Sequence, residues 1–315
     1  LDAFQIGAFP VTNAEYALFI AAGGYEDEQW WDTDAAKAWR RGDGTADGPK
    51  QGWRDTRKLL ENWTNEDLRG LVDQGRMTSK QADDYIMVKN WSEQKFEDWL
   101  EEMFPGGRKT LPEYWEDTAF NGPSQPVVGI CWYEARAYCA WLTAQVRGDA
   151  LTPNRPSHAS GRPKRGVPLG EGLLFRLPTE VEFEAAARGA TGRKFPFGDT
   201  FDSARCNTFE SHIRRTTPIG IFDNKTPEGA YDLSGNAYTW TSSSYNQEQF
   251  PYPYQIDDGR EDPNRSDVRR VLRGGSWSNY RGHARAVYRH LYRPANRDDD
   301  LGFRVVCVGV PSQSI

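Results

Sequence analysis

VLRGGSW, at residues 271–277, and GFRVV, at residues 302–306, are two apolar blocks near the end of the chain. They enclose the polar stretch SNYRGHARAVYRHLYRPANRDDDL, residues 278–301. The blocks have the composition of core strands, because branched and aromatic residues fit a half-buried pleated surface. The stretch between them is rich in Ser, Asn, Tyr, His and Asp, with arginines at intervals. We therefore predict a framework at both ends and a displayed surface between them.

The composition predicts a loop-rich globular domain with a core of large rings. The chain has 315 residues, 13% of them aromatic, with 30 glycines and 19 prolines. A net charge of −6 without a basic stripe argues against nucleic acid as a partner. The sequence has no signal peptide and no apolar run of the roughly 18 residues that a membrane span requires. We expect a soluble chain, and its compartment is not predicted.

The four cysteines show no CxxC pairing. Cys131 and Cys139 lie eight residues apart on a predicted helix, too far for a bridge between them. We expect these two, with Cys206 and Cys307, to be buried thiols, and a disulfide framework is the alternative.

Two helices are predicted from capping boxes. In a capping box, a Thr side chain and the side chain of a Glu three residues later each accept a hydrogen bond from the other residue's backbone N–H. The two boxes are Thr12 with Glu15, stopped by Gly23-Gly24, and Thr179 with Glu182, stopped by Gly189. Residues 130–142 predict a further helix, and one of its faces is interpreted as core. That face contains Ala135, Tyr138, Cys139 and Leu142.

Residues 45–108 are rich in charge and tryptophan and are interpreted as a helical insertion. Apolar spacing predicts helices near 56–62, 65–74, 79–89 and 93–104, with Ser92 as the N-cap of the last and Gly106-Gly107 after it. The insertion is either a structural elaboration or an addition to a binding rim. Residues 146–172 form a Pro/Gly/Arg-rich loop, and short strands and turns are expected from about residue 173.

Six segments in order resemble the formylglycine-generating-enzyme, or sulfatase-modifying factor, domain. They are FPVTNAEY (9–16), PVVGICWYEA (126–135), RLPTE (176–180), GAYDLSGNAYTW (229–240), RGGSW (273–277) and GFRVV (302–306). The resemblance implies an α+β, C-type-lectin-like fold with a twisted antiparallel sheet, flanking helices and much irregular structure. It implies one domain over 1–315 that contains the 45–108 insertion and a C-terminal variable region at 271–306.

The enzymes of that family are the alternative function. Its oxidases use a copper-binding cysteine pair that would fall near Asn279 and Ala284, and neither residue can replace a thiolate on Cu(I). Its sulfoxide synthases hold iron with three histidines. The four histidines of this chain, His158, His212, His283 and His290, show no clustered ligand spacing. We therefore expect no catalytic residues, and a metal-dependent oxidase or sulfoxide synthase remains the alternative.

The polar stretch is similar to the variable region of proteins of diversity-generating retroelements. In these, template adenines are randomised, so that AAY codons come to encode Ser, Thr, Ile, Asp, His or Tyr as well as Asn. The resemblance implies a set of ligand-binding residues of these types. They are Ser278, Asn279, Tyr280, His283, His290, Tyr292, Asp298, Asp299 and Asp300. An ordinary polar loop rich in turn formers is the structural alternative.

The surface needs a framework, because a region that accepts many sequences contributes little to its own folding. Trp277, Phe303 and Val305 are expected to be buried anchors. Arg285, Arg289 and Arg297 are expected to fix the loops by forked hydrogen bonds, with solvated side chains as the alternative. Tyrosines mixed with Ser, Asn and Asp are typical of antibody paratopes. We therefore predict a non-catalytic binder of a macromolecule, with a protein as the favoured class.

No cofactor is predicted, but the resemblance implies candidate ligands for structural calcium. Asn236 matches one site of the relatives, although Thr239 stands where a glutamate is usual; Asn207 and Thr208 match part of a second site. Asp298-Asp299-Asp300 is a further candidate for a cation, with a solvated acidic loop as the alternative.

Overall fold

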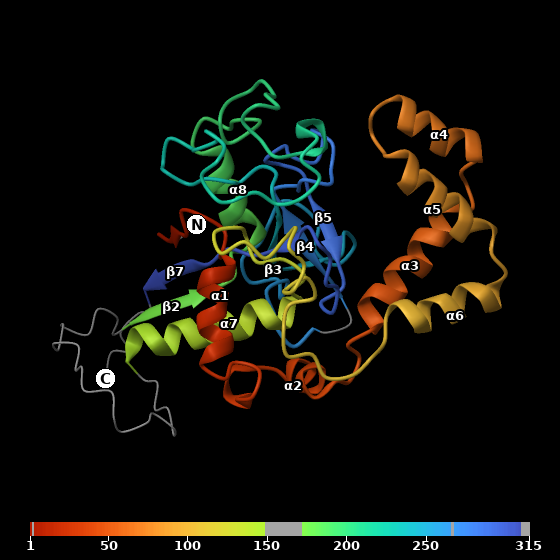
Figure 1. Ribbon diagram of the computed structural model, residues 1–315. Helices are drawn as coiled ribbons and strands as arrows, with labels where there is room; N and C mark the ends of the chain where they lie inside the picture. Colours follow the sequence, from red (N-terminus) through yellow and green to blue (C-terminus); the bar gives the residue numbers. More distant parts are fainter. Residues whose placement is uncertain (2, 149–171, 266–267, 310–315) are drawn as a thin grey trace.

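The computed structural model describes residues 1, 3–148, 172–265 and 268–309. It combines helices with two small β-sheets (Figure 1). Within the described ranges, no helix has the length and apolar character needed to cross a membrane.

The first sheet has three antiparallel strands in the order β1-β7-β2. They are β1 (Gln5–Ile6), β7 (Val306–Gly309) and β2 (Leu173–Arg176). The second sheet has four strands in the order β5-β4-β3-β6. They are β5 (His290–Tyr292), β4 (Arg269–Arg273), β3 (Tyr238–Tyr245) and β6 (Leu301–Gly302).

This arrangement differs from the single antiparallel sheet that was expected. β6 runs parallel to β3, and β7 belongs to the other sheet. Residues 303–305 of the GFRVV block separate these two strands and are not themselves in a strand. The block therefore crosses from one sheet to the other, which alternation of residue types does not reveal.

The capped helices begin where the sequence predicts. They are α1 (Asn13–Ala21), capped by Thr12 with Glu15, and α8 (Glu180–Arg188), capped by Thr179 with Glu182 and ended by Gly189. The helix predicted within 130–142 is α7 (Trp132–Arg147). On its predicted face Ala135, Tyr138 and Cys139 are buried and Leu142 is partly buried. Two short 3-10 turns lie at η1 (Glu28–Trp30) and η2 (Phe209–Ser211).

The insertion contains the helices α3 (Asp47–Leu60), α4 (Asn65–Asp73), α5 (Ser79–Asn90) and α6 (Glu93–Met103). They form an arm beside the second sheet (Figure 1) with a small core of their own around Phe96 and Leu100. α3 begins earlier than predicted, because Pro49 is tolerated in the first turn of a helix. Ser92 caps α6 as predicted, but α6 ends before Gly106-Gly107. The preceding helix α2 (Asp34–Arg41) was not predicted.

The main core lies between α1, α7 and the second sheet and is rich in aromatic rings, as the composition predicts. Tyr16, Tyr138 and Phe303 pack together, with centroid distances of 5.2–6.2 Å. All four cysteines are free thiols; Cys131, Cys139 and Cys206 are buried and Cys307 is half-buried. The disulfide alternative is thus excluded. The predicted loop 146–172, with His158, lies almost wholly outside the described residues.

Candidate ligand-binding surface

The C-terminal stretch follows the edge of the second sheet. It leaves β4 through Gly274 and Gly275, whose φ angles are 93° and 72°, and later forms the edge strand β5. A Cβ on Gly275 would lie 2.9 Å from the carbonyl carbon of His283, so this turn requires glycine. On β5, His290 and Tyr292 share one face, because successive side chains of a strand alternate.

Five rings of the stretch form a continuous row. Centroid distances are 4.6 Å for Tyr280–His283, 4.3 Å for His283–Tyr288 and 4.9 Å for His290–Tyr292, and His283 and His290 are 6.4 Å apart. All five side chains are half-buried. Tyr288 was missed by the sequence reasoning, although a tyrosine has the composition of the predicted set. The row presents apolar ring area together with hydroxyl and imidazole groups.

The row is electrically neutral near pH 7. Burial lowers the pKa of both His283 and His290 to about 4, so both imidazoles are uncharged. The His283 Nδ1 atom lies 3.1 Å from the Tyr238 hydroxyl, and the His290 ring stacks on the Tyr238 ring at 5.2 Å. Tyr238 is buried in β3, so it fixes the orientation of both imidazoles.

The three consecutive aspartates differ from one another. Asp300 is only 6% exposed, and the hydroxyls of Ser276 and Ser278 each lie 2.6 Å from its carboxylate. Asp298 and Asp299 are half-buried. Burial, followed by the neighbouring carboxylates, raises the pKa of Asp298 and of Asp299 to about 7. Asp300 is therefore bonded to the framework, while the other two remain accessible to a ligand.

The remaining residues of the predicted contact set, Ser278 and Asn279, are also half-buried. They follow Trp277, which packs on Phe120 at 5.9 Å and donates from Nε1 to the Asp299 backbone oxygen at 3.3 Å. Trp277 and Val305 are half-buried, whereas the third predicted anchor, Phe303, is 1% exposed. Phe303 thus lies in the core and Trp277 at its margin.

The three predicted scaffold arginines have different environments. Arg297 is buried and pairs with Glu134 and Glu113, at 3.1 Å and 2.8 Å. Arg289 pairs with the buried Glu180 at 2.6 Å. Arg285 is exposed, and its Nε donates to the Gly282 backbone oxygen at 2.9 Å. Of these three arginines, only Arg297 and Arg289 pair with side chains outside the stretch.

Three buried arginines of the framework were not predicted: Arg270, Arg273 and Arg304. Arg273 donates to the backbone oxygens of Val287 and Tyr288, at 3.0 Å and 2.9 Å. Arg304 donates to the backbone oxygens of Gly7 and Tyr231. Their presence inside otherwise apolar blocks was the sequence signal that could have identified them. A buried guanidinium needs several acceptors, so such an arginine is expected to bond to other parts of the framework.

The insertion adjoins this surface at two cavities. One, of about 770 Å³, lies between Arg76 of the insertion and Tyr280, and the Arg76 guanidinium carbon is 4.7 Å from the Tyr280 ring centroid. The other, of about 170 Å³, lies between α3, α5 and Tyr292. The insertion therefore contributes side chains to the edge of the candidate surface.

The candidate calcium ligands are already occupied by hydrogen bonds. The Asn236 Oδ1 atom accepts from the Thr217 N–H at 2.8 Å, and Asn236 Nδ2 donates to the Thr217 oxygen at 3.1 Å. Asn207 Nδ2 donates to the Arg215 oxygen at 2.9 Å, and Thr208 Oγ1 donates to Glu210 at 2.8 Å. The amide oxygens of Asn207 and Asn236 accept from Ser211 and Thr217, so they are engaged within the protein, and calcium at these residues remains a prediction. Among the described residues, no three His, Cys, Asp or Glu side chains group as metal ligands.

The positions at which the related oxidases hold copper contain no thiol. Ala284 is buried beside Phe195 and Cys206, and the Cys206 thiol donates to the Ser234 backbone oxygen at 3.1 Å. Burial raises the pKa of the Cys206 thiol well above its usual value. This thiol is therefore protonated at neutral pH in the metal-free protein.

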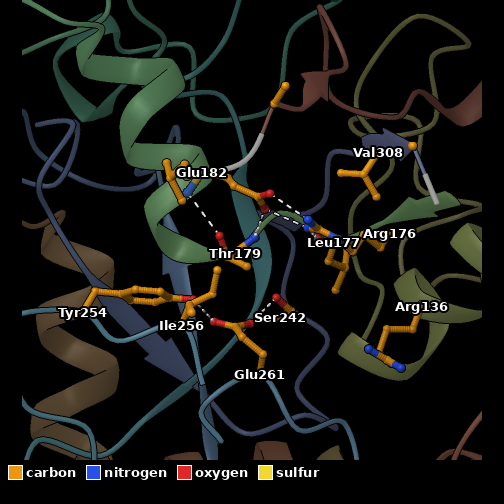
Figure 2. A pocket seen from close by; sticks show the side chains of 13 residues that line it. Arg136, Arg176, Leu177, Thr179, Glu182, Ser242, Tyr254, Ile256, Glu261 and Val308 are labelled. Carbon is orange, nitrogen blue, oxygen red and sulfur yellow. Dashed lines mark hydrogen bonds and ion pairs between the residues drawn. The ribbon is translucent and has the colours of Figure 1, made fainter. Parts of the chain in front are cut away.

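A separate cavity of about 460 Å³ lies near the first sheet (Figure 2). Its polar side chains are bonded to one another: Arg176 donates twice to Glu182, at 2.7 Å each, and the Tyr254 hydroxyl donates to Glu261 at 2.8 Å. Burial raises the pKa of Glu261. Of the described residues that line this cavity, none is a cysteine or histidine. The cavity thus lacks the side chains that either metal chemistry of the related enzymes requires.

Comparisons with known proteins identify relatives whose sequences align with between about half and nearly all of this chain. Serine/threonine-protein kinase pkn1 of Chlamydia caviae is 31% identical over 180 residues, which are 57% of this chain and 23% of the kinase. Inactive C-alpha-formylglycine-generating enzyme 2 of Bos taurus is 28% identical over 320 residues, 96% of this chain and 76% of the relative. Hercynine oxygenase of Mycolicibacterium thermoresistibile is 26% identical over 319 residues, 97% of this chain and 51% of the relative. The chain thus spans only about a quarter of the kinase and half of the oxygenase.

Among solved structures, Treponema denticola variable protein 1 overlaps 59% of this chain and 72% of its own chain, with 24% identity and a TM-score of 0.44. That overlap is too partial to bear on function. The family model of the sulfatase-modifying factor enzyme 1-like domain matches residues 1–308, nearly the whole chain. The chain belongs to the sulfatase-modifying factor enzyme 1-like family.

Proposed function

We propose that this protein is a non-catalytic ligand-binding protein with a C-type-lectin-like framework. Its binding surface is the C-terminal stretch 271–306, diversified by a retroelement. The observation that carries the proposal is a division of burial within this stretch. Of the predicted framework residues, Arg297 and Phe303 are buried, Trp277 and Arg289 are half-buried and Arg285 is exposed. Arg273 and Arg304 of the two flanking blocks are also buried. Of the nine predicted contact residues, eight keep exposed area, and only Asp300 is buried.

The partner is a macromolecule, and a protein suits the surface best. The row of five rings offers rigid contact area with hydroxyl groups at its edge, as protein-binding paratopes do. The cavities beside it are open indentations along one side of the molecule, which suit the side chains of a larger partner.

Membership of the family is compatible with a binding role. One relative that matches 96% of this chain is named an inactive enzyme. The alternative of a metal-dependent oxidase or sulfoxide synthase would instead require a tightly bound copper or iron. Metal analysis of the purified protein tests this alternative, since a stoichiometric transition metal would support it and refute the binding proposal.

The proposal is tested by tolerance to mutation. In one display library the eight accessible contact residues are randomised to Asn, Ser, Thr, Ile, Asp, His and Tyr. In a matched library, the same alphabet is applied to Arg270, Arg273, Asp300 and Arg304. We expect most clones of the first library to resist proteolysis and most of the second to be degraded. Equal degradation of the two libraries would refute the proposal.

Binding is then selected from the first library against a purified test protein such as lysozyme. We expect clones that bind this protein to be recovered, and their selected substitutions should lie along the ring row. The genomic neighbourhood supplies an independent check. A nearby reverse transcriptase gene and a second copy of the 3′ coding end that differs only at adenines are expected; their absence would remove the retroelement from the proposal.

A further inference from the structure

The smaller cavity between the insertion and the C-terminal stretch has the chemistry of a cation site. It has a volume of about 170 Å³ and is lined by aromatic rings from both sides. The lining residues that matter are Trp53, Tyr85 and Phe104 from the insertion and Tyr292, Asn296 and Asp298 from the C-terminal stretch. All four rings are half-buried, so each retains area that a ligand can cover.

The two sides of the cavity are held in place by contacts below it. A Cβ on Gly48 would lie 2.7 Å from the Asn296 backbone nitrogen, so α3 approaches this backbone closely. Asp55 of α3 pairs with Arg269 of β4 and lies 3.7 Å from Arg293. The cavity is thereby a fixed feature of the fold, because α3 is anchored to the second sheet on which Tyr292 lies.

The acceptors in the cavity have no cation of the protein beside them. In the described part of the chain, no Lys, Arg or His side chain lies within 4.0 Å of the Asp298 carboxylate. Asn296 is 4% exposed, and its Oδ1 atom is buried without a hydrogen-bond partner. The Asp298 carboxylate accepts hydrogen bonds from the neutral side chains of Asn296 and Tyr292. A ligand with a positive charge would supply the cation that Asp298 lacks.

The rings favour an ammonium over a planar cation. Trp53 and Tyr85 meet at 78°, with centroids 6.1 Å apart, and Trp99 supports Trp53 from behind at 5.0 Å and 89°. Two nearly perpendicular rings form a corner, and a tetrahedral ammonium can contact both rings at once. A guanidinium, by contrast, stacks flat on one ring. Cations over aromatic faces are attracted by the negative face of the ring, more strongly when they are desolvated.

We propose that this cavity binds a lysine side chain of the partner, with its ammonium in the corner formed by the Trp53 and Tyr85 rings and against Asp298. The proposal rests on the proposed function, since Asp298 belongs to the diversified set while Trp53, Tyr85 and Phe104 lie outside 271–306. The insertion would then provide a constant aromatic wall, and one variable position would provide the charge that selects a cationic partner.

The experiment uses the full chain and the probe Nα-acetyl-lysine methylamide, followed by ¹H–¹⁵N NMR at the Trp53 indole N–H. That signal is assigned by its loss in Trp53→Phe. We expect saturable shifts of this signal with the lysine probe and none with the Nε-acetylated probe, which has no charge. Equal shifts with both probes would overturn the proposal. Binding of Nα-acetyl-arginine methylamide as tight as that of the lysine probe would overturn the choice of an ammonium.

Two matched variants connect the shifts to the cavity. Asp298→Asn should raise the dissociation constant of the lysine probe about ten-fold, because it removes one charge-assisted contact. Asp299→Asn, next to it but outside the cavity lining, should bind within about two-fold of the wild type. Unchanged binding by Asp298→Asn would refute the site, provided that its spectrum shows the native fold.

Failure of the cation site and failure of the proposed function give different results. If the lysine probe does not bind but the contact library still folds, the surface remains a binding surface without this cation site. If the probe binds and the contact library is degraded, the cavity is a cation site of a protein that is not diversified.

Discussion

The guanidinium of Arg297 donates from Nε to Glu134 Oε2 at 3.1 Å, and both side chains are buried. Glu134 lies in the first turn of α7, so this pair joins the C-terminal stretch to the main core helix. The second Glu134 oxygen accepts from the Tyr25 hydroxyl at 2.6 Å. Burial lowers the pKa of Arg297, but the carboxylate of Glu134 outweighs this effect and the net shift is upward, so Arg297 is charged.

Arg297→Met should destabilise the protein strongly, because it leaves the Glu134 carboxylate buried without its cation. We expect a loss of about 3–5 kcal/mol in the free energy of unfolding, the range for one broken buried pair. Arg285→Met is the control, because Arg285 is exposed and bonds only to a backbone oxygen within its own loop. It should change stability by less than about 0.5 kcal/mol. Urea unfolding measures both; similar losses would contradict the distinct roles of the two arginines.

Asp300→Ala should destabilise the protein, whereas Asp299→Ala should not. Asp300 lies 2.6 Å from the Ser276 and Ser278 hydroxyls, and its loss leaves buried Ser276 without that partner. We expect a cost of about 1–3 kcal/mol for Asp300→Ala. Asp299 has no such bonds to buried groups among the described residues, so its variant should stay within about 0.5 kcal/mol of the wild type. A larger loss for Asp299→Ala would show that Asp299 also belongs to the framework.

These contacts show which parts of the molecule were predictable. The capping boxes at Thr12 and Thr179 were found because cap and partner are three residues apart in sequence. The framework role of Arg304 could not be predicted, because the backbone oxygens that accept from it, on Gly7 and Tyr231, belong to distant parts of the chain. Asp300 has the same sequence signal as its two neighbours. Only its tertiary contacts separate it from residues that face a ligand.

The stability of the protein should depend on Asp298 in a pH-dependent way. Burial raises the pKa of Asp298 from 3.8 to about 7 in the folded state. A carboxyl group with a raised folded pKa favours folding when it is protonated, so its contribution is complete below pH 3.8 and is lost as the pH rises through 7. Asp298→Asn should therefore gain stability relative to the wild type as the pH rises from 4 to 8.

The control for this prediction is Asp67→Asn, on the exposed α4 helix. The backbone N–H of Thr64 lowers the pKa of Asp67, so its contribution is present at neutral pH and is lost as the pH falls. When urea unfolding is measured between pH 4 and 8, the stability of Asp67→Asn relative to the wild type should stay nearly constant, because the contribution of Asp67 changes only below about pH 3.8. The relative stability of Asp298→Asn should rise over the same range. A parallel trend would refute the assignment of the raised pKa to Asp298.

Calcium should not stabilise the protein through Asn207 and Asn236. The Asn236 side chain already bonds to both backbone groups of Thr217, and Asn207 Nδ2 donates to a backbone oxygen. We expect the same melting temperature in millimolar calcium and in EDTA. An increase of several degrees with calcium, abolished in Asn236→Ala, would show that these amides turn their oxygens toward a bound ion.

The cysteines should react as isolated buried thiols. Burial raises the pKa of Cys131, Cys139 and Cys206, and a thiol reacts with an alkylating agent only as the exposed thiolate. Cys307 is half-buried, and burial also raises its pKa. We expect iodoacetamide at pH 7.5 to modify Cys307 alone, and slowly, in the native protein, and all four cysteines in urea, as counted by intact mass. Rapid labelling of Cys206 that copper(I) prevents would reveal a reactive metal-binding thiolate beside Ala284 and would favour the oxidase alternative over the binding surface.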